Sequence, residues 1–143
     1  WYEVVKNGMF IGRHNHHLEE KGRLSVPKKF RSQLENGAIL SQGLDGCLFL
    51  YPKSAWLELV DKLNQMPLTR ADSRNFLRSL SYGAVEVEID SLGRILIPEY
   101  LKNFAQIKSD CVVAGAIERI EIWDSDSFEK FNTKISEQPK DFI

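Results

Sequence analysis

Residues 18–27 read Leu-Glu-Glu-Lys-Gly-Arg-Leu-Ser-Val-Pro, and residues 89–98 read Ile-Asp-Ser-Leu-Gly-Arg-Ile-Leu-Ile-Pro, so one pattern occurs twice, 71 residues apart. Both copies contain an apolar residue, an acid, two variable residues, Gly-Arg, an apolar-rich run and a proline. Glycine is favoured where a turn needs a positive φ, and proline suits the first position of a helix. Each copy therefore predicts a strand end, a turn at the glycine, a strand that starts at the arginine, and a helix after the proline.

The similarity between the two halves continues beyond this stretch. Residues 28–34 and 99–105 both have helical character, residues 48–50 correspond to 120–122, and Trp56 corresponds to Phe128. Each half therefore predicts a strand, a turn, a strand, a short helix, two strands and a helix. Because a repeat sets the architecture of a chain, we expect a mainly β protein with short helices, arranged about a pseudo-twofold axis.

The rest of the pattern gives the expected positions of individual elements. Short runs of β-favouring residues between turn residues predict strands, and the prolines delimit two connector helices. Ser125 or Ser127 is expected to cap a final helix through its hydroxyl group. The strands are expected at residues 9–18, 23–26, 38–40, 47–51, 85–89, 111–114 and 119–123, and the connector helices within 52–81.

The chain resembles the MraZ family of bacterial regulators, which have two tandem SpoVT-AbrB-like modules. The resemblance covers residues 9–131, and one position departs from the family pattern, since Glu19 stands where an aspartate is usual. It implies a double-split β-barrel made of modules at residues 13–55 and 84–127, a helical connector at 56–83, and a C-terminal helix and tail at 128–143. The residues that carry the resemblance are Glu19 to Arg23, Asp90 to Arg94, Met9-Phe10-Ile11-Gly12, Pro27-Lys28-Lys29-Phe30-Arg31, Cys47 to Pro52 with Trp56, and Glu121-Ile122-Trp123.

The same resemblance implies a function and its partners. AbrB-like modules are similar in binding DNA through loops and strands that bear arginine. A member of this family is expected to be a sequence-specific transcriptional regulator that binds direct repeats upstream of its own promoter, in the division and cell-wall gene cluster, as a repressor. The implied partners are double-stranded DNA and further copies of the chain in a ring-shaped homo-oligomer, within the cytoplasm and at the nucleoid.

The first turn has the residues for reading DNA. Lys21 and Arg23 flank Gly22, and arginine can bind a guanine edge with two hydrogen bonds in the major groove. The alternative is a solvated turn with an internal Glu19–Arg23 ion pair. The other basic residues of this region are expected near the same loop, in contact with phosphates, unless they form an ordinary charged surface. They are Arg13, Lys28, Lys29 and Arg31.

Charge differs between the two halves. Residues 12–31 contain six basic and two acidic residues, whereas residues 110–143 contain four basic and eight acidic ones, although the whole chain has a net charge of only −1. Lys21 of the first turn is replaced by Leu92 in the second, which suits burial against a neighbouring subunit. We therefore predict that the first half reads DNA and that the residues common to both turns have structural roles, namely Glu19, Gly22, Asp90, Gly93 and Arg94.

Other chemistry finds little support in the sequence. We find no phosphate-binding loop, nucleophile elbow or His-Glu metal motif, and predict no enzymatic activity, cofactor or small-molecule substrate. His14, His16 and His17 lack further ligands at metal spacing, so no metal site is predicted. Cys47 and Cys111 are expected to be buried thiols in a reducing compartment, and no apolar run is long enough to span a membrane.

Two features leave alternatives open. Arg70, Arg74 and Arg78 form a basic stripe that suits either DNA or acidic residues of a neighbouring subunit. An oligomeric protein-binding scaffold without DNA specificity is the alternative function, and it would lack the steep dependence on salt that phosphate contacts cause. Residues 1–8 precede a methionine and are expected to be an extension before the natural start.

Overall fold

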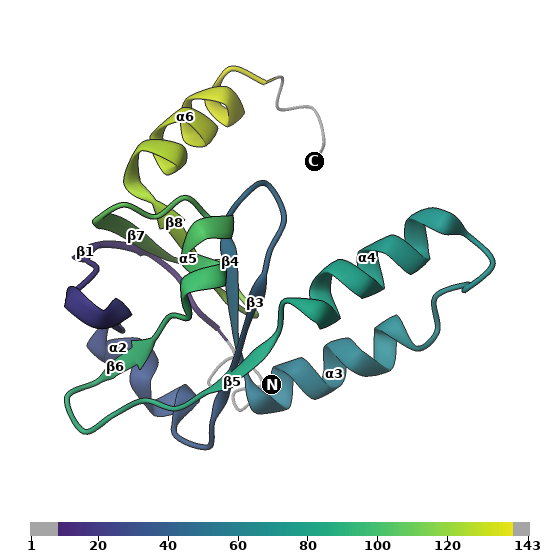
Figure 1. Cartoon of the computed structure of the whole chain (residues 1–143), viewed down its shortest axis with the longest axis horizontal. Helices are drawn as coiled ribbons and strands as arrows, with labels where there is room; N and C mark the ends of the chain where they lie inside the picture. Colours follow the sequence, from purple (N-terminus) through teal and green to yellow (C-terminus); the bar gives the residue numbers. More distant parts are fainter. Residues whose placement is uncertain (1–8, 139–143) are drawn as a thin grey trace.

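The computed structural model describes residues 9–138, so the extension expected at residues 1–8 and the tail from residue 139 lie outside the described residues (Figure 1). Strands and short helices make up most of the body. The strands are β1 (Arg13–His17), β2 (Arg23–Ser25), β3 (Ala38–Gln42), β4 (Leu48–Pro52), β5 (Val85–Val87), β6 (Arg94–Leu96), β7 (Asp110–Gly115) and β8 (Ile120–Asp124). The helices are η1 (Glu20–Gly22), α2 (Lys28–Arg31), η2 (Ser32–Leu34), α3 (Lys53–Leu63), α4 (Ala71–Tyr82), α5 (Glu99–Phe104) and α6 (Ser125–Ser136).

Six of the strands form one antiparallel sheet with the order β1-β7-β8-β4-β3-β5. In the repeat, β1, β3 and β4 of the first half correspond to β5, β7 and β8 of the second. Replacing each strand by its counterpart gives the same strand order read backwards. At its centre β4 pairs with β8, where Leu48 lies opposite Ile122 and Leu50 opposite Ile120. The two halves are therefore interleaved in one sheet, as the pseudo-twofold expectation requires, whereas closure of the sheet into a barrel stays a prediction.

The remaining two strands, one from each half, pair to form a short two-stranded ribbon. β2 and β6 are antiparallel, and Leu24 lies opposite Ile95, its counterpart in the repeat. On either side of this pair, the Ile97 N–H donates to the Gly22 carbonyl at 2.8 Å and the Val26 N–H donates to the Gly93 carbonyl at 2.9 Å. The pseudo-twofold axis thus passes through the ribbon, and each turn is hydrogen-bonded to the strand end of the other half.

The main core lies between the ribbon, the short helices and one face of the sheet. Alternate residues of a strand point to opposite faces, so Leu48 and Leu50 enter this core while Phe49 and Tyr51 point away from it. The central side chains have at most 2 % of their surface exposed. They include Leu24, Phe30, Leu34, Leu40, Leu48, Leu50, Ile95, Leu101, Ile120 and Ile122.

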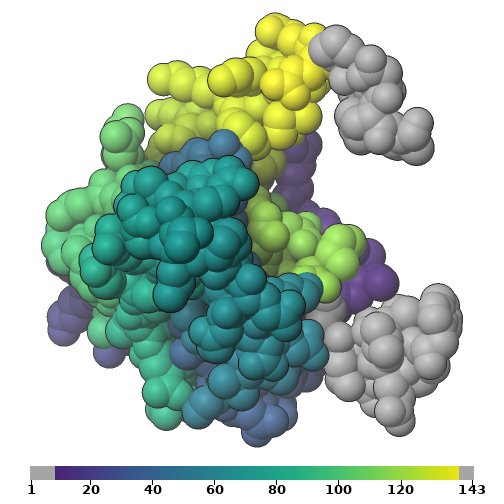
Figure 2. Space-filling view, turned by 90° about the vertical axis from the view of Figure 1, so that its right-hand side faces the viewer, coloured from purple at the N-terminus to yellow at the C-terminus, as the bar shows by residue number. Residues whose placement is uncertain are grey.

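A second core covers the other face of the sheet. There α3 and α4 form a hairpin that projects from the sheet, and α6 covers a separate area (Figures 1 and 2). The indole of Trp123 stacks on Phe131 with ring centroids 5.0 Å apart. Both cysteines are free and buried, as predicted, and burial raises the pKa of Cys111 to about 11. Among the described residues, no helix has the length and apolar character needed to cross a lipid bilayer.

The cap of α6 differs from the prediction. Asp124, the last residue of β8, accepts a hydrogen bond from the Ser127 N–H at 3.2 Å, while Ser125 and Ser127 lie inside the helix. Asp124 is extended, with φ −62° and ψ 138°, which is the backbone geometry of a capping residue. The helix begins directly at the strand end, and the prediction of a serine cap was therefore wrong.

Candidate nucleic-acid interface

The repeated pattern builds the same corner twice. In the first turn the Glu19 N–H donates to the Arg23 carbonyl at 2.8 Å, and in the second the Asp90 N–H donates to the Arg94 carbonyl at 2.9 Å. The glycines have φ angles of +83° and +80°, a region that side chains disfavour. The first turn alone also has a lysine in this region, Lys21 with φ +72°, and its side chain is exposed.

The second turn is closed by its own side chains. One carboxylate oxygen of Asp90 accepts the N–H groups of Leu92 and Arg94, both at 2.9 Å, and the other accepts Arg94 Nε at 3.0 Å. The hydrogen bond from the Arg94 backbone is the main reason that the pKa of Asp90 is lowered. Arg94 also donates to Glu19 at 3.3 Å, so its guanidinium is held by one acid from each half.

The first turn is open by comparison. The Glu19 carboxylate is turned to Arg94, and Arg23 makes no ion pair with any residue between 9 and 138. The alternative of a Glu19–Arg23 pair was therefore wrong. Glutamate has one methylene more than aspartate, and here it extends past its own turn to the opposite half. The result is a partly exposed arginine beside an exposed lysine, with no carboxylate bound to either.

The other predicted phosphate contacts do not gather at this loop. The Nε of Arg31 donates to the Val26 carbonyl at 2.8 Å, and its guanidinium covers Gly93 of the second turn. This position follows from the ribbon, because β2 runs away from the first turn and carries α2 to the second. The remaining residues point elsewhere: Arg13 lies 5.5 Å over the Phe128 ring, Lys29 lies beside Gly12 and over Phe30, and Lys28 is exposed on α2.

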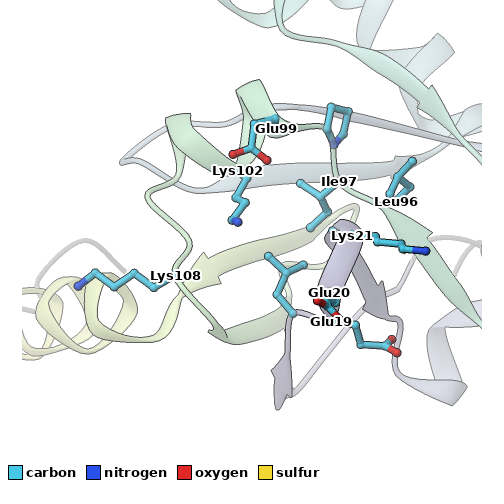
Figure 3. A pocket seen from close by; sticks show the side chains of 11 residues that line it. Glu19, Glu20, Lys21, Leu96, Ile97, Glu99, Lys102 and Lys108 are labelled. Atoms are coloured by element: carbon cyan, nitrogen blue, oxygen red, sulfur yellow. The ribbon is translucent and has the colours of Figure 1, made fainter.

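A hollow of about 530 Å³ lies between the first turn and the start of α5 (Figure 3). Its lining combines the first turn with residues that follow β6 in the second half, among them Glu99, Lys102 and Lys108. These three residues were not among the site residues predicted from the sequence. The repeat contained a usable signal, however, because Lys102 stands 71 residues after Arg31 and occupies the matching helix position.

Comparison with known proteins places the chain in a family. The model of the family described as MraZ protein matches residues 9–79 and again residues 80–141. The chain belongs to the MraZ family. Among its relatives, proteins named transcriptional regulator MraZ from Alkaliphilus metalliredigens and Desulforamulus reducens are 48 % and 43 % identical to it, over 87 % and 88 % of this chain and 87 % and 89 % of theirs. One from Moorella thermoacetica is 42 % identical over 91 % of both chains.

In this MraZ family member the histidines of β1 have separate environments. The Nδ1 of His17 lies 3.0 Å from an Asp110 carboxylate oxygen at the surface. The pKa of His16 is lowered, chiefly by burial and further by nearby His14 and Arg31. Within residues 9–138 no three side chains of His, Cys, Asp or Glu are placed to hold a metal ion together.

The arginine stripe lies on the projecting hairpin. Arg70 pairs with Asp72 at 2.8 Å, Arg74 donates to the Leu68 carbonyl at 2.8 Å, and Arg78 donates to Asn75 at 3.4 Å. Two of the three guanidinium groups therefore have close partners on or next to α4 itself. None of the three arginines lines the hollow of the first turn.

Proposed function

We propose that this chain is a sequence-specific DNA-binding transcriptional regulator. Its relatives carry the name transcriptional regulator MraZ. The observation that carries the proposal is the state of Arg23, which is partly exposed beside exposed Lys21 while Glu19 is bound to Arg94 instead. A guanidinium without a carboxylate partner can donate two parallel hydrogen bonds to a guanine. Lys21 can reach a guanine or a phosphate from the same turn.

The proposal gives the two halves different tasks. The first turn reads bases, and Lys28, Lys29 and Arg13, which lie away from this loop, supply phosphate contacts elsewhere on the DNA that add affinity without sequence information. The second turn has a structural role, together with Glu19 and Gly22, because Arg94 is bound on both sides by acids. The contact of Arg31 with Val26 and Gly93 favours a structural role for this arginine as well.

One short loop offers few base contacts, so the proposal includes several subunits acting together. A ring-shaped homo-oligomer that binds direct repeats would raise the affinity through effective concentration. We propose that these repeats lie upstream of the chain's own promoter in the division and cell-wall gene cluster, that binding represses transcription, and that the protein acts at the nucleoid. The modules that provide the two turns are assigned to residues 13–55 and 84–127.

A footprint on the DNA upstream of the chain's own gene tests the proposal. We expect protection of regularly spaced repeats, together with an affinity that falls steeply with salt, since log K falls by about 0.9 per phosphate contact for each tenfold rise in salt. A scrambled fragment of equal length and composition is the control. Equal binding to both fragments, or none to either, would favour the alternative of a protein-binding scaffold without DNA specificity.

A further inference from the structure

The two turns differ in what fills the space above their glycines. At the second turn this space holds the guanidinium of Arg31, which donates to the Val26 carbonyl at 2.8 Å and lies so close to Gly93 that a side chain there would collide with it. Gly93 is buried as a consequence. The second turn thus contains an arginine-binding slot that the chain fills with its own side chain.

The backbone of this slot is repeated at the first turn. Gly22 matches Gly93 in φ, and the Ile97 carbonyl takes the place of the Val26 carbonyl, 71 residues later in the repeat. The Ile97 carbonyl oxygen lies over Gly22, 2.8 Å from where a β-carbon would be. No donor from residues 9–138 reaches this oxygen. The shape of the slot and its acceptor are therefore present, without the arginine.

The side chain at the matching helix position is Lys102 in place of Arg31. A lysine ammonium cannot reproduce the planar fork of a guanidinium, and Lys102 does not bond to the Ile97 carbonyl. Gly22 accordingly stays partly exposed, and the hollow of about 530 Å³ opens beside it (Figure 3).

The rim of the open slot is more acidic than that of the filled one. Glu20 and Glu99 line the hollow, whereas the matching positions at the second turn are Ser91 and Lys28. Of the other lysines that line the hollow, Lys108 has its ammonium 3.7 Å from Asp126, and the Lys21 side chain extends away from Lys102 and Lys108 (Figure 3). The open slot therefore has two carboxylates that the filled slot lacks, which favours a cation arriving from outside.

We propose that this hollow is a binding site for the guanidinium of an arginine side chain from another protein molecule. The guanidinium donates to the Ile97 carbonyl, lies flat over Gly22 as that of Arg31 lies over Gly93, and pairs with Glu20 or Glu99. Lys102 moves aside when the site fills. The site adjoins the proposed contact of Lys21 and Arg23 with DNA, because Lys21 also lines the hollow, but guanidinium binding does not depend on that contact.

Amide hydrogen exchange of the full chain tests the site, with N-acetyl-L-arginine amide as the probe. Exchange in peptides covering residues 18–24 and 95–102 should slow about twofold when the probe concentration equals its Kd, because only the free molecules open. N-acetyl-L-lysine amide is the control and should have little effect. Lys102→Ala should respond at lower probe concentrations, since no ammonium has to be displaced.

Lys102→Arg gives the opposite result if the site is as proposed. Its own guanidinium fills the slot, so exchange in both peptides should be slow without the probe and unchanged by it. The proposal is overturned if the arginine probe has no effect on the native chain and on Lys102→Ala, if the lysine probe acts equally, or if Lys102→Arg still responds. Light scattering separates the sources: a lower mass for Lys102→Arg identifies another copy of this chain as the donor, and an unchanged mass identifies a different protein.

Discussion

At the residue scale, matched arginines of the repeat have different partners. Arg94 is bound by Asp90 and Glu19, whereas Arg23 is bound by neither. Arg23→Ala should therefore lower specific DNA affinity by about 1–3 kcal/mol per lost bidentate contact while the fold stays intact. A mobility shift and a thermal melt on the same sample measure both effects, with Lys62→Ala on α3 as a control of equal charge change. Full specific binding by a folded Arg23→Ala protein would contradict the prediction.

For Arg31 we expect an effect on stability, because its guanidinium is hydrogen-bonded within the chain. Arg31→Ala should lower the free energy of unfolding by about 1–2 kcal/mol, since the hydrogen bond to the Val26 carbonyl and the cover over Gly93 are lost. Lys28→Ala, on the same helix and exposed, should change stability little. Denaturant unfolding of both variants checks this, and equal stabilities would mean that Arg31 contributes only surface charge.

Asp90 gives the second turn a dependence on pH. Its pKa is lowered in the folded state, chiefly by the hydrogen bond from the Arg94 backbone, so its contribution to stability is complete above the ordinary carboxyl pKa and is lost as pH falls through the folded value. Asp90→Asn should therefore unfold with a weaker dependence on pH in the acid range. Thermal melts between about pH 2 and pH 5 measure the difference, and parallel curves would show that Asp90 is not coupled to folding.

At the element scale, the sequence was informative where a local signal exists. The Gly22 and Gly93 turns, the strands around them and the helices after the prolines all follow from residues close together in the chain. What it could not give was the pairing of β2 with β6, because contacts between residues 71 apart depend on tertiary packing. This pairing carries α2 to the second turn and α5 to the first, so Arg31 and Lys102 each lie beside the turn of the opposite half.

The exact start of α6 is a second feature that local sequence signals could not predict. By sequence preference Asp124, Ser125 or Ser127 could each cap the helix. Asp124 is the cap because β8 ends there and α6 begins at the next residue. Asp124→Ala should lower stability by about 1 kcal/mol through loss of the cap. Ser125→Ala should have almost no effect, although Ser125 was one of the two serines expected to cap the helix. Unfolding of the two variants under identical conditions compares them, and a larger loss for Ser125→Ala would reverse the assignment.

At the scale of the whole molecule, the two halves have equivalent backbone arrangements in the sheet but carry different side chains on their surfaces. Lys21 is exposed on the first turn, and Leu92, at the matching position of the second, has 66 % of its surface exposed. An exposed leucine on a turn contributes nothing to the core of a single chain. The proposed oligomer would remove this side chain from water, whereas an apolar side chain cannot pair with the phosphates of DNA.

This difference yields the last prediction, which compares two double variants. Lys21→Ala with Arg23→Ala should lose specific DNA binding and keep the mass of the native assembly, because these two side chains are proposed to contact DNA and are not the groups proposed to bind a guanidinium over Gly22. Leu92→Ala with Arg94→Ala should loosen the fold or the assembly and weaken DNA binding only through the loss of cooperating subunits. Light scattering, thermal melts and mobility shifts on direct repeats distinguish these outcomes. If the second variant kept its stability and mass but lost DNA binding outright, the second turn would have to contact DNA itself.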